Sequence, residues 1–105
     1  MKALVLRTDE THEVIDLPTD YREIGNLVGG WLELVNVRGG FLYVNEEGKL
    51  KNLTPNLKAT RFCHAREAIR ANDFIVGDVV LVGVLDRKGE HKDVDKALIQ
   101  ELLIA

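Results

Sequence analysis

The cations of one stretch of the chain are the residues with the clearest capacity for binding chemistry. Between Gly48 and Ala71 the sequence carries six lysine or arginine residues and one carboxylate, whereas the rest carries eight basic and sixteen acidic residues. Guanidinium and ammonium groups that face one side bind phosphates or carboxylates together. This stretch is therefore expected to meet an anionic partner, through Lys58, Arg61, Arg66 and Arg70.

Cys63 and His64 are the natural candidates for a nucleophile or a metal ligand. Adjacent side chains on a helix diverge by about 100°, so this thiol and imidazole cannot easily meet at one metal ion or act as nucleophile and base. The remaining histidines show no metal-ligand spacing such as Cys-x-x-Cys or His-Glu-x-x-His. The sequence therefore predicts no catalytic residue, no metal site and no cofactor, and the protein is expected not to be an enzyme.

Trp31 and Tyr43 are aromatic residues that could stack on a nucleobase. Both lie in segments that are predicted to be strands, where side chains alternate between two faces. That position favours packed aromatic side chains over exposed platforms. We expect Trp31 and Tyr43 to pack within the protein.

Short apolar segments separated by turns must position these residues. The helices are predicted after a cap at Thr19 or Asp20 up to the Gly29-Gly30 pair, from Leu57 to Ala71, and after a cap at Asp93 or Asp95. The middle helix is expected to bury Phe62, Ala65 and Ile69, and the last helix Val94, Ala97, Leu98 and Leu102. The predicted strands cover residues 3–6, 12–17, 31–37, 41–45, 49–51 and 79–85, the last of them a buried central strand.

Length and composition predict one α+β domain over residues 1–105. The chain is 46% hydrophobic and 30% charged, as ordinary globular proteins are. We expect a mixed or antiparallel sheet of about five or six strands, covered by two or three helices. No run approaches the roughly 20 apolar residues that a spanning helix needs, and the lone cysteine requires no oxidising compartment. No membrane association is predicted, and the cytoplasm is the expected location.

The order of several short motifs resembles a known family. These motifs include Val44-Asn45-Glu46-Glu47-Gly48-Lys49-Leu50, the segment from Ile75 to Gly83, and the segment from Val28 to Glu33. They are similar to the domain-of-unknown-function family numbered three-eight-four-six, across residues 1 to 83. The resemblance implies a small accessory protein of bacteria, phages or plasmids, acting in the host cytoplasm if a phage encodes it. It also implies that Asn45 and Asn56 recur in the family, either as turn and cap residues or as parts of a ligand site.

Three functions are compatible with these features, in order of preference. The first is a non-enzymatic binding module that acts on a host protein with an acidic surface. The second is sequestration of a small anion such as a nucleotide, with Arg61, Arg66 or Arg70 holding phosphate and Asn45 or Asn56 reading polar groups. The third is nucleic-acid binding, which the net charge of −3 disfavours. A merely solvated cationic surface is the competing interpretation. If the surface is functional, replacing Arg61, Arg66 and Arg70 together by glutamate is expected to leave folding nearly intact and to abolish binding, whereas retained binding would indicate a solvated surface.

Overall fold

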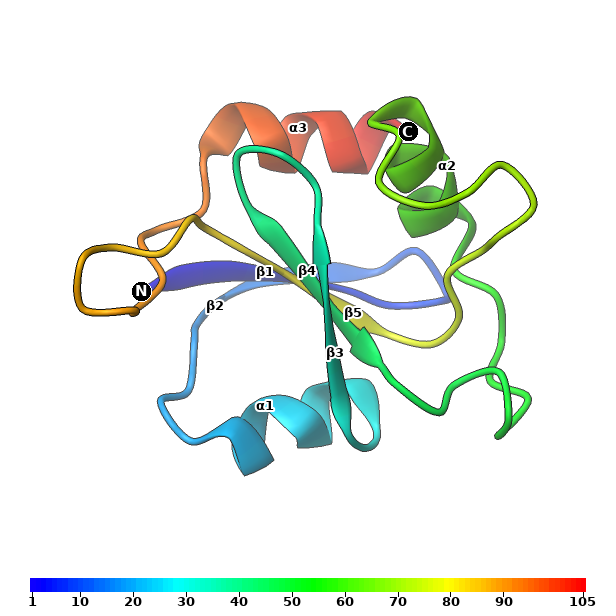
Figure 1. Ribbon diagram of the computed structural model, residues 1–105, viewed down its shortest axis with the longest axis horizontal. Coiled ribbons are helices and arrows are strands. Elements are labelled where there is room, and N and C mark those ends of the chain that lie inside the picture. Colours follow the sequence, from blue (N-terminus) through cyan, green and yellow to red (C-terminus); the bar gives the residue numbers. More distant parts are fainter.

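The computed structural model describes every residue from Met1 to Ala105. A five-stranded antiparallel sheet has the strand order β2-β1-β5-β4-β3. Figure 1 shows one helix on one side of this sheet and two helices on the other. The predicted α+β fold is therefore confirmed. The elements are β1 (Lys2–Leu6), β2 (His12–Asp16), α1 (Tyr21–Val28), β3 (Leu32–Asn36), β4 (Phe41–Asn45), α2 (Leu57–Ala65), β5 (Val79–Val82) and α3 (Lys96–Ile104).

Strand β5 lies at the centre because all four of its side chains are apolar and can be buried on both faces. Val80 and Val82 pack under α1, whereas Val79 and Leu81 belong to the larger core under α2 and α3. The sheet thus separates two hydrophobic cores. The prediction that the segment beginning at Val79 forms a buried central strand is confirmed, although the strand ends at Val82 and not at residue 85.

Two predicted hairpins are confirmed, and each has a turn that local chemistry explains. In the β1–β2 turn, the Asp9 carboxylate accepts hydrogen bonds from the backbone N–H and the hydroxyl of Thr11. In the β3–β4 turn, Arg38 and Gly39 both have positive φ angles, of 60° and 91°. Glycine adopts such angles without steric cost, whereas the unusual φ of Arg38 is accompanied by a hydrogen bond from its N–H to the side chain of Asn36.

Helices α1 and α3 begin at caps that the sequence predicts. The side chain of Asp20 accepts a hydrogen bond from the N–H of Arg22, and Gly29 ends α1 in the left-handed conformation with φ of 84°. The side chain of Asp95 caps α3 in the same manner. Leu98 and Leu102 are buried as predicted, but Ala97 is exposed.

Helix α2 is shorter than predicted. It ends at Ala65 and not at residue 71, because Glu67 turns the backbone into the left-handed region with φ of 54°. The N–H of Ala68 then donates back to the carbonyl of Cys63, which closes the helix end without a glycine. The buried stripe is consequently different from the predicted one. It consists of Ala59, Phe62 and Cys63, while Ala65 is exposed and Ile69 contacts the core from the following loop.

The predicted short strand at residues 49–51 is also wrong. Residues 46–52 form consecutive turns, in which the N–H of Lys51 donates to the carbonyl of Glu47 and the N–H of Leu53 donates to that of Gly48. These local hydrogen bonds compete with strand pairing. The sheet therefore has five strands, and the loop after β4 is left to form one wall of a surface hollow.

Candidate functional site

Arg66, the central residue of the predicted cationic surface, is bonded within the molecule. One of its terminal nitrogens donates to both carboxylate oxygens of Glu101 on α3, each at 2.7 Å. Its other nitrogens donate to the carbonyls of Val37 and Arg38 in the β3–β4 turn. Arg66 therefore joins the end of α2 to α3 and to that hairpin, and most of its hydrogen-bonding capacity is used.

Lys58 and Arg61 contact the C-terminal end of α3. The Lys58 ammonium group donates to the carbonyl of Leu103 at 2.8 Å, and Arg61 donates to the carbonyl of Ala105 at 3.1 Å. The last carbonyls of a helix have no partner within it and carry partial negative charge. Both cations thus serve the packing of α2 against α3.

The two candidate asparagines have structural partners. Asn56 is 2% exposed, caps α2 through the N–H of Ala59, and donates its amide protons to the carbonyls of Leu6 and Gly77. Asn45 donates to the carbonyl of Val28 and accepts from the N–H of Glu47. Both amides are satisfied within the fold, as turn and cap residues are.

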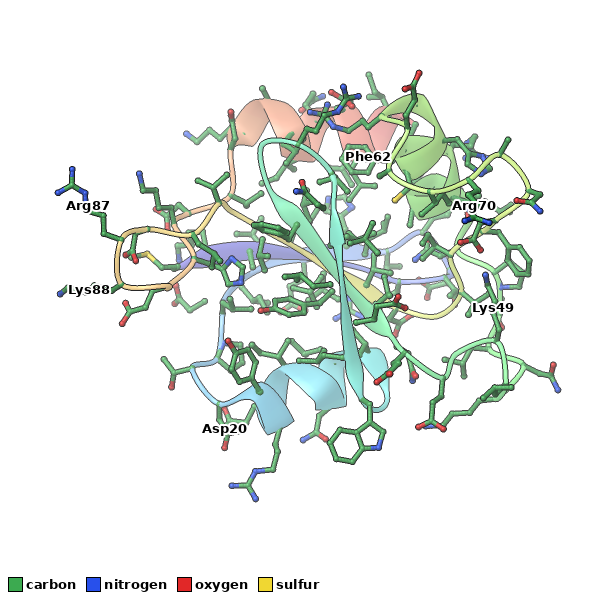
Figure 2. All side chains as sticks on the ribbon, in the orientation of Figure 1. Asp20, Lys49, Phe62, Arg70, Arg87 and Lys88 are labelled. Carbon is green, nitrogen blue, oxygen red and sulfur yellow. The ribbon has the colours of Figure 1, made fainter.

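Arg70 is the one predicted cation that lines a large hollow, and Asn45 contributes to the lining of the same hollow. It lies in the loop after α2 and not one helical turn from Arg66, because α2 has already ended. Figure 2 shows Arg70 and Lys49 on the same side of the molecule, with Arg87 and Lys88 at the opposite end. The six predicted residues therefore do not form one site.

The hollow beside Arg70 has a volume of about 730 Å³ and lies between β3, β4 and the loops that follow β4 and α2. We call it the acidic hollow, because four carboxylates and only two cations line it, a formal charge of −2. Lys49 is already paired with Asp73, whose pKa it holds below the usual value, and it lies over the Phe74 ring. The charged lining residues are Glu33, Glu46, Glu67, Asp73, Lys49 and Arg70.

A second hollow, of about 540 Å³, lies on the other face of the sheet between α1 and β3. We call it the aromatic hollow, after Tyr21, Trp31 and Tyr43 in its lining. Arg22 and Lys51 add two cations, of which Arg22 has only a 3.7 Å contact with Asp20 and Lys51 has no ion pair. This hollow therefore combines aromatic surface with accessible positive charge.

Trp31 is 73% exposed, so the prediction that it packs within the protein is wrong, whereas Tyr43 is buried as expected. The exposure of Trp31 follows from its position in the chain. Trp31 precedes the first residue of β3, and the inward and outward alternation of a strand does not apply to it. A large exposed aromatic side chain next to an apolar hollow is typical of binding surfaces.

The edge of β3 between the two hollows is open. Val37 donates to the carbonyl of Gly40 and Glu46 donates to that of Trp31 at the two ends of the β3–β4 ladder. Because outward and inward backbone groups alternate along an antiparallel strand, the N–H and C=O groups of Leu32, Leu34 and Asn36 point away from β4. Leu34 is also 43% exposed. The strand thus offers both backbone groups and an apolar side chain.

Cys63 and His91 are held inside the fold. Burial, with a smaller contribution from Asp73, raises the pKa of the Cys63 thiol to about 12. The His91 ring donates to the carbonyl of Gly83 and contacts the Tyr43 hydroxyl at 2.9 Å. No group of three or more His, Cys, Asp or Glu side chains is placed to hold a metal ion. Cys63 and His91 are therefore engaged within the fold and do not contribute to the surface around β3.

None of the three helices has the length and apolar character needed to cross a membrane. No curated protein and no solved structure matched the chain. A family model, described as Domain of unknown function (DUF3846), matches residues 1–104. The match extends beyond the motifs at residues 1 to 83 and includes the loop after β5 and all of α3. The chain therefore belongs to the DUF3846 family.

Proposed function

We propose that the protein is a non-enzymatic binding module that acts on another protein, and that it uses the surface around β3. The observation that carries the proposal is Trp31, which is 73% exposed beside the open edge of β3 and the aromatic hollow. Tryptophan is among the residues that contribute most to protein interfaces. An accessory role on a host protein, as the family resemblance implies, is compatible with this surface.

The position of the cations supports this surface over the α2 surface. Lys58, Arg61 and Arg66 are committed to contacts with α3 and the β3–β4 turn. Arg22 and Lys51, by contrast, lie next to Trp31 and are accessible. An acidic group on the partner, which the sequence predicts, would meet these two cations.

The proposal is tested by capture of the partner from the native host with tagged protein. We expect the wild type to retain a stoichiometric protein partner, and Trp31→Ala to lose it, because the main apolar anchor is removed. Ile104→Ala is the matched control, since Ile104 on α3 is also 73% exposed but lies away from β3. Equal capture by the wild type and Trp31→Ala would contradict the proposal.

A small anionic ligand is the second candidate, and the aromatic hollow favours it specifically. A nucleobase could stack on Trp31 or Tyr21 while Arg22 and Lys51 meet the phosphate. Titration calorimetry with nucleotides separates the two functions. Saturable nucleotide binding that Lys51→Ala abolishes would favour sequestration, and its failure would leave the protein-binding proposal.

A further inference from the structure

We infer that β3 accepts an extended segment of a partner protein as a sixth strand, and that this segment alternates apolar and basic side chains. The inference rests on the proposed function and specifies how the partner is recognised. It combines three features of β3, namely its open edge, the two hollows beside it and the difference in charge between them.

The open edge supplies the main-chain hydrogen bonds. Leu32, Leu34 and Asn36 direct their N–H and C=O groups away from β4. Peptides that add a strand to a sheet gain affinity from such groups and specificity from pockets for alternate side chains. Three of the five residues of β3 are therefore available to pair with an added strand.

The opposite edge of the sheet, β2, carries charged side chains, as edges that are protected from pairing do. Three of its five residues are ionisable. Asp16 forms an ion pair with Lys2 of β1, and Glu13 forms one with Arg7, which follows β1. Charged side chains on an edge discourage addition of another strand. In β3 only Glu33 is charged, so the two edges are not equivalent.

The two faces of β3 determine which side chains the added strand carries. Leu32 packs with the core under α1, so Leu32 and Leu34 face the aromatic hollow. Val35 packs with the core under α2 and α3, so Glu33 faces the acidic hollow. An added strand would place alternate side chains over these two hollows. Apolar residues match the aromatic hollow, and lysine or arginine matches the acidic hollow.

A second copy of this chain fits the edge less well than another protein does. If two β3 strands paired antiparallel about Leu34, each Glu33 would lie opposite Val35 of the other copy, on the face of the acidic hollow. The carboxylates of both copies, including Glu46 and Glu67, would then gather on one surface. Bringing these like charges together costs electrostatic energy, so the charge favours a partner segment that is basic on the face of the acidic hollow.

The test uses a capped peptide, Ser-Lys-Leu-Lys-Val-Lys-Ser, and a version with glutamate at each lysine position. We expect the lysine peptide to bind at least about tenfold more tightly in fluorescence anisotropy, because its cations face the carboxylates. Binding should also slow hydrogen exchange at the amides of Leu32, Leu34 and Asn36. Equal affinity of the two peptides, or no binding by either, would overturn the inference.

Two matched variants locate the binding to one edge. Leu34→Pro removes an outward N–H without removing a hydrogen bond to β4, and proline is tolerated at such edge positions. Val14→Pro makes the equivalent change on β2, whose Val14 is also exposed and outward-facing. We expect loss of at least about tenfold in affinity for the first variant and no change for the second. Equal effects of the two would contradict the inference.

Peptide methylation gives the same information if Leu34→Pro fails to fold. Alternate amides of a strand point in opposite directions. One peptide is methylated at the backbone nitrogens of its lysines, and a second at those of Leu and Val. Only one of these two peptides should lose binding. Loss in both cases, or a concentration-dependent dimer of the protein in light scattering, would overturn the inference. Partner capture that depends on Trp31 but not on these changes would leave the proposed function intact.

Discussion

Asn56 is a residue whose buried polar side chain has all its partners within the fold. Its amide satisfies the first turn of α2 and two carbonyls from distant segments, those of Leu6 and Gly77. The capping role could be predicted, because asparagine before an apolar segment is a common cap. The two long-range bonds could not be predicted, because they depend on how α2 packs against β1 and the segment before β5.

The structural role of Asn56 predicts a loss of stability. Asn56→Ala removes the cap and two buried hydrogen bonds to the carbonyls of Leu6 and Gly77, so the free energy of unfolding should fall by about 2–4 kcal/mol. Asn72→Ala, in an exposed turn, should change it by less than about 0.5 kcal/mol. Urea unfolding measures both. Wild-type stability in Asn56→Ala would show that this side chain is retained for another purpose.

At the scale of elements, the parts with local signals could be predicted and those that depend on tertiary contacts could not. The hairpins and the caps Asp20 and Asp95 follow from turn residues and apolar spacing. The end of α2 does not, because Glu67 takes a conformation that sequence rules assign to glycine. Arg66 explains this end in part, since its bonds to Glu101 and to the β3–β4 turn fix the chain where α2 stops.

Arg66 should therefore matter for stability, contrary to the expectation that glutamate at all three arginines leaves folding nearly intact. Arg66→Ala should lower the free energy of unfolding by about 1–3 kcal/mol, mainly through its carbonyl hydrogen bonds, because the partly exposed Glu101 pair is screened by solvent. Arg66→Lys should be nearly as destabilised as Arg66→Ala, since lysine cannot donate in the same planar geometry as arginine.

Arg70→Ala is the control for this prediction. The Arg70 side chain is exposed and makes no hydrogen bond or ion pair within the fold, so its removal should change stability by less than about 0.5 kcal/mol. Thermal or urea unfolding compares the variants. Indistinguishable curves for Arg66→Ala and Arg70→Ala would mean that the Arg66 contacts add nothing to the fold.

At the scale of the whole molecule, the distribution of charge differs from the arrangement that sequence suggested. The basic stretch is divided among contacts with α3, a pair with Asp73, and the two hollows. The acidic hollow could not be predicted, because its carboxylates come from β3, the loop after β4 and the loop after α2. Only the fold brings these segments together beside the open edge of β3.

The most direct test of the proposed binding surface uses Trp31, which is the single tryptophan of the chain. Protein labelled with 5-fluorotryptophan gives one fluorine NMR resonance, and an exposed indole leaves that resonance sensitive to solvent. Addition of the partner captured from the native host should shift the resonance and reduce its sensitivity to solvent, because the ring becomes buried in the complex. If the partner binds while the resonance of Trp31 keeps its position and its exposure to solvent, the surface around β3 is not the binding surface.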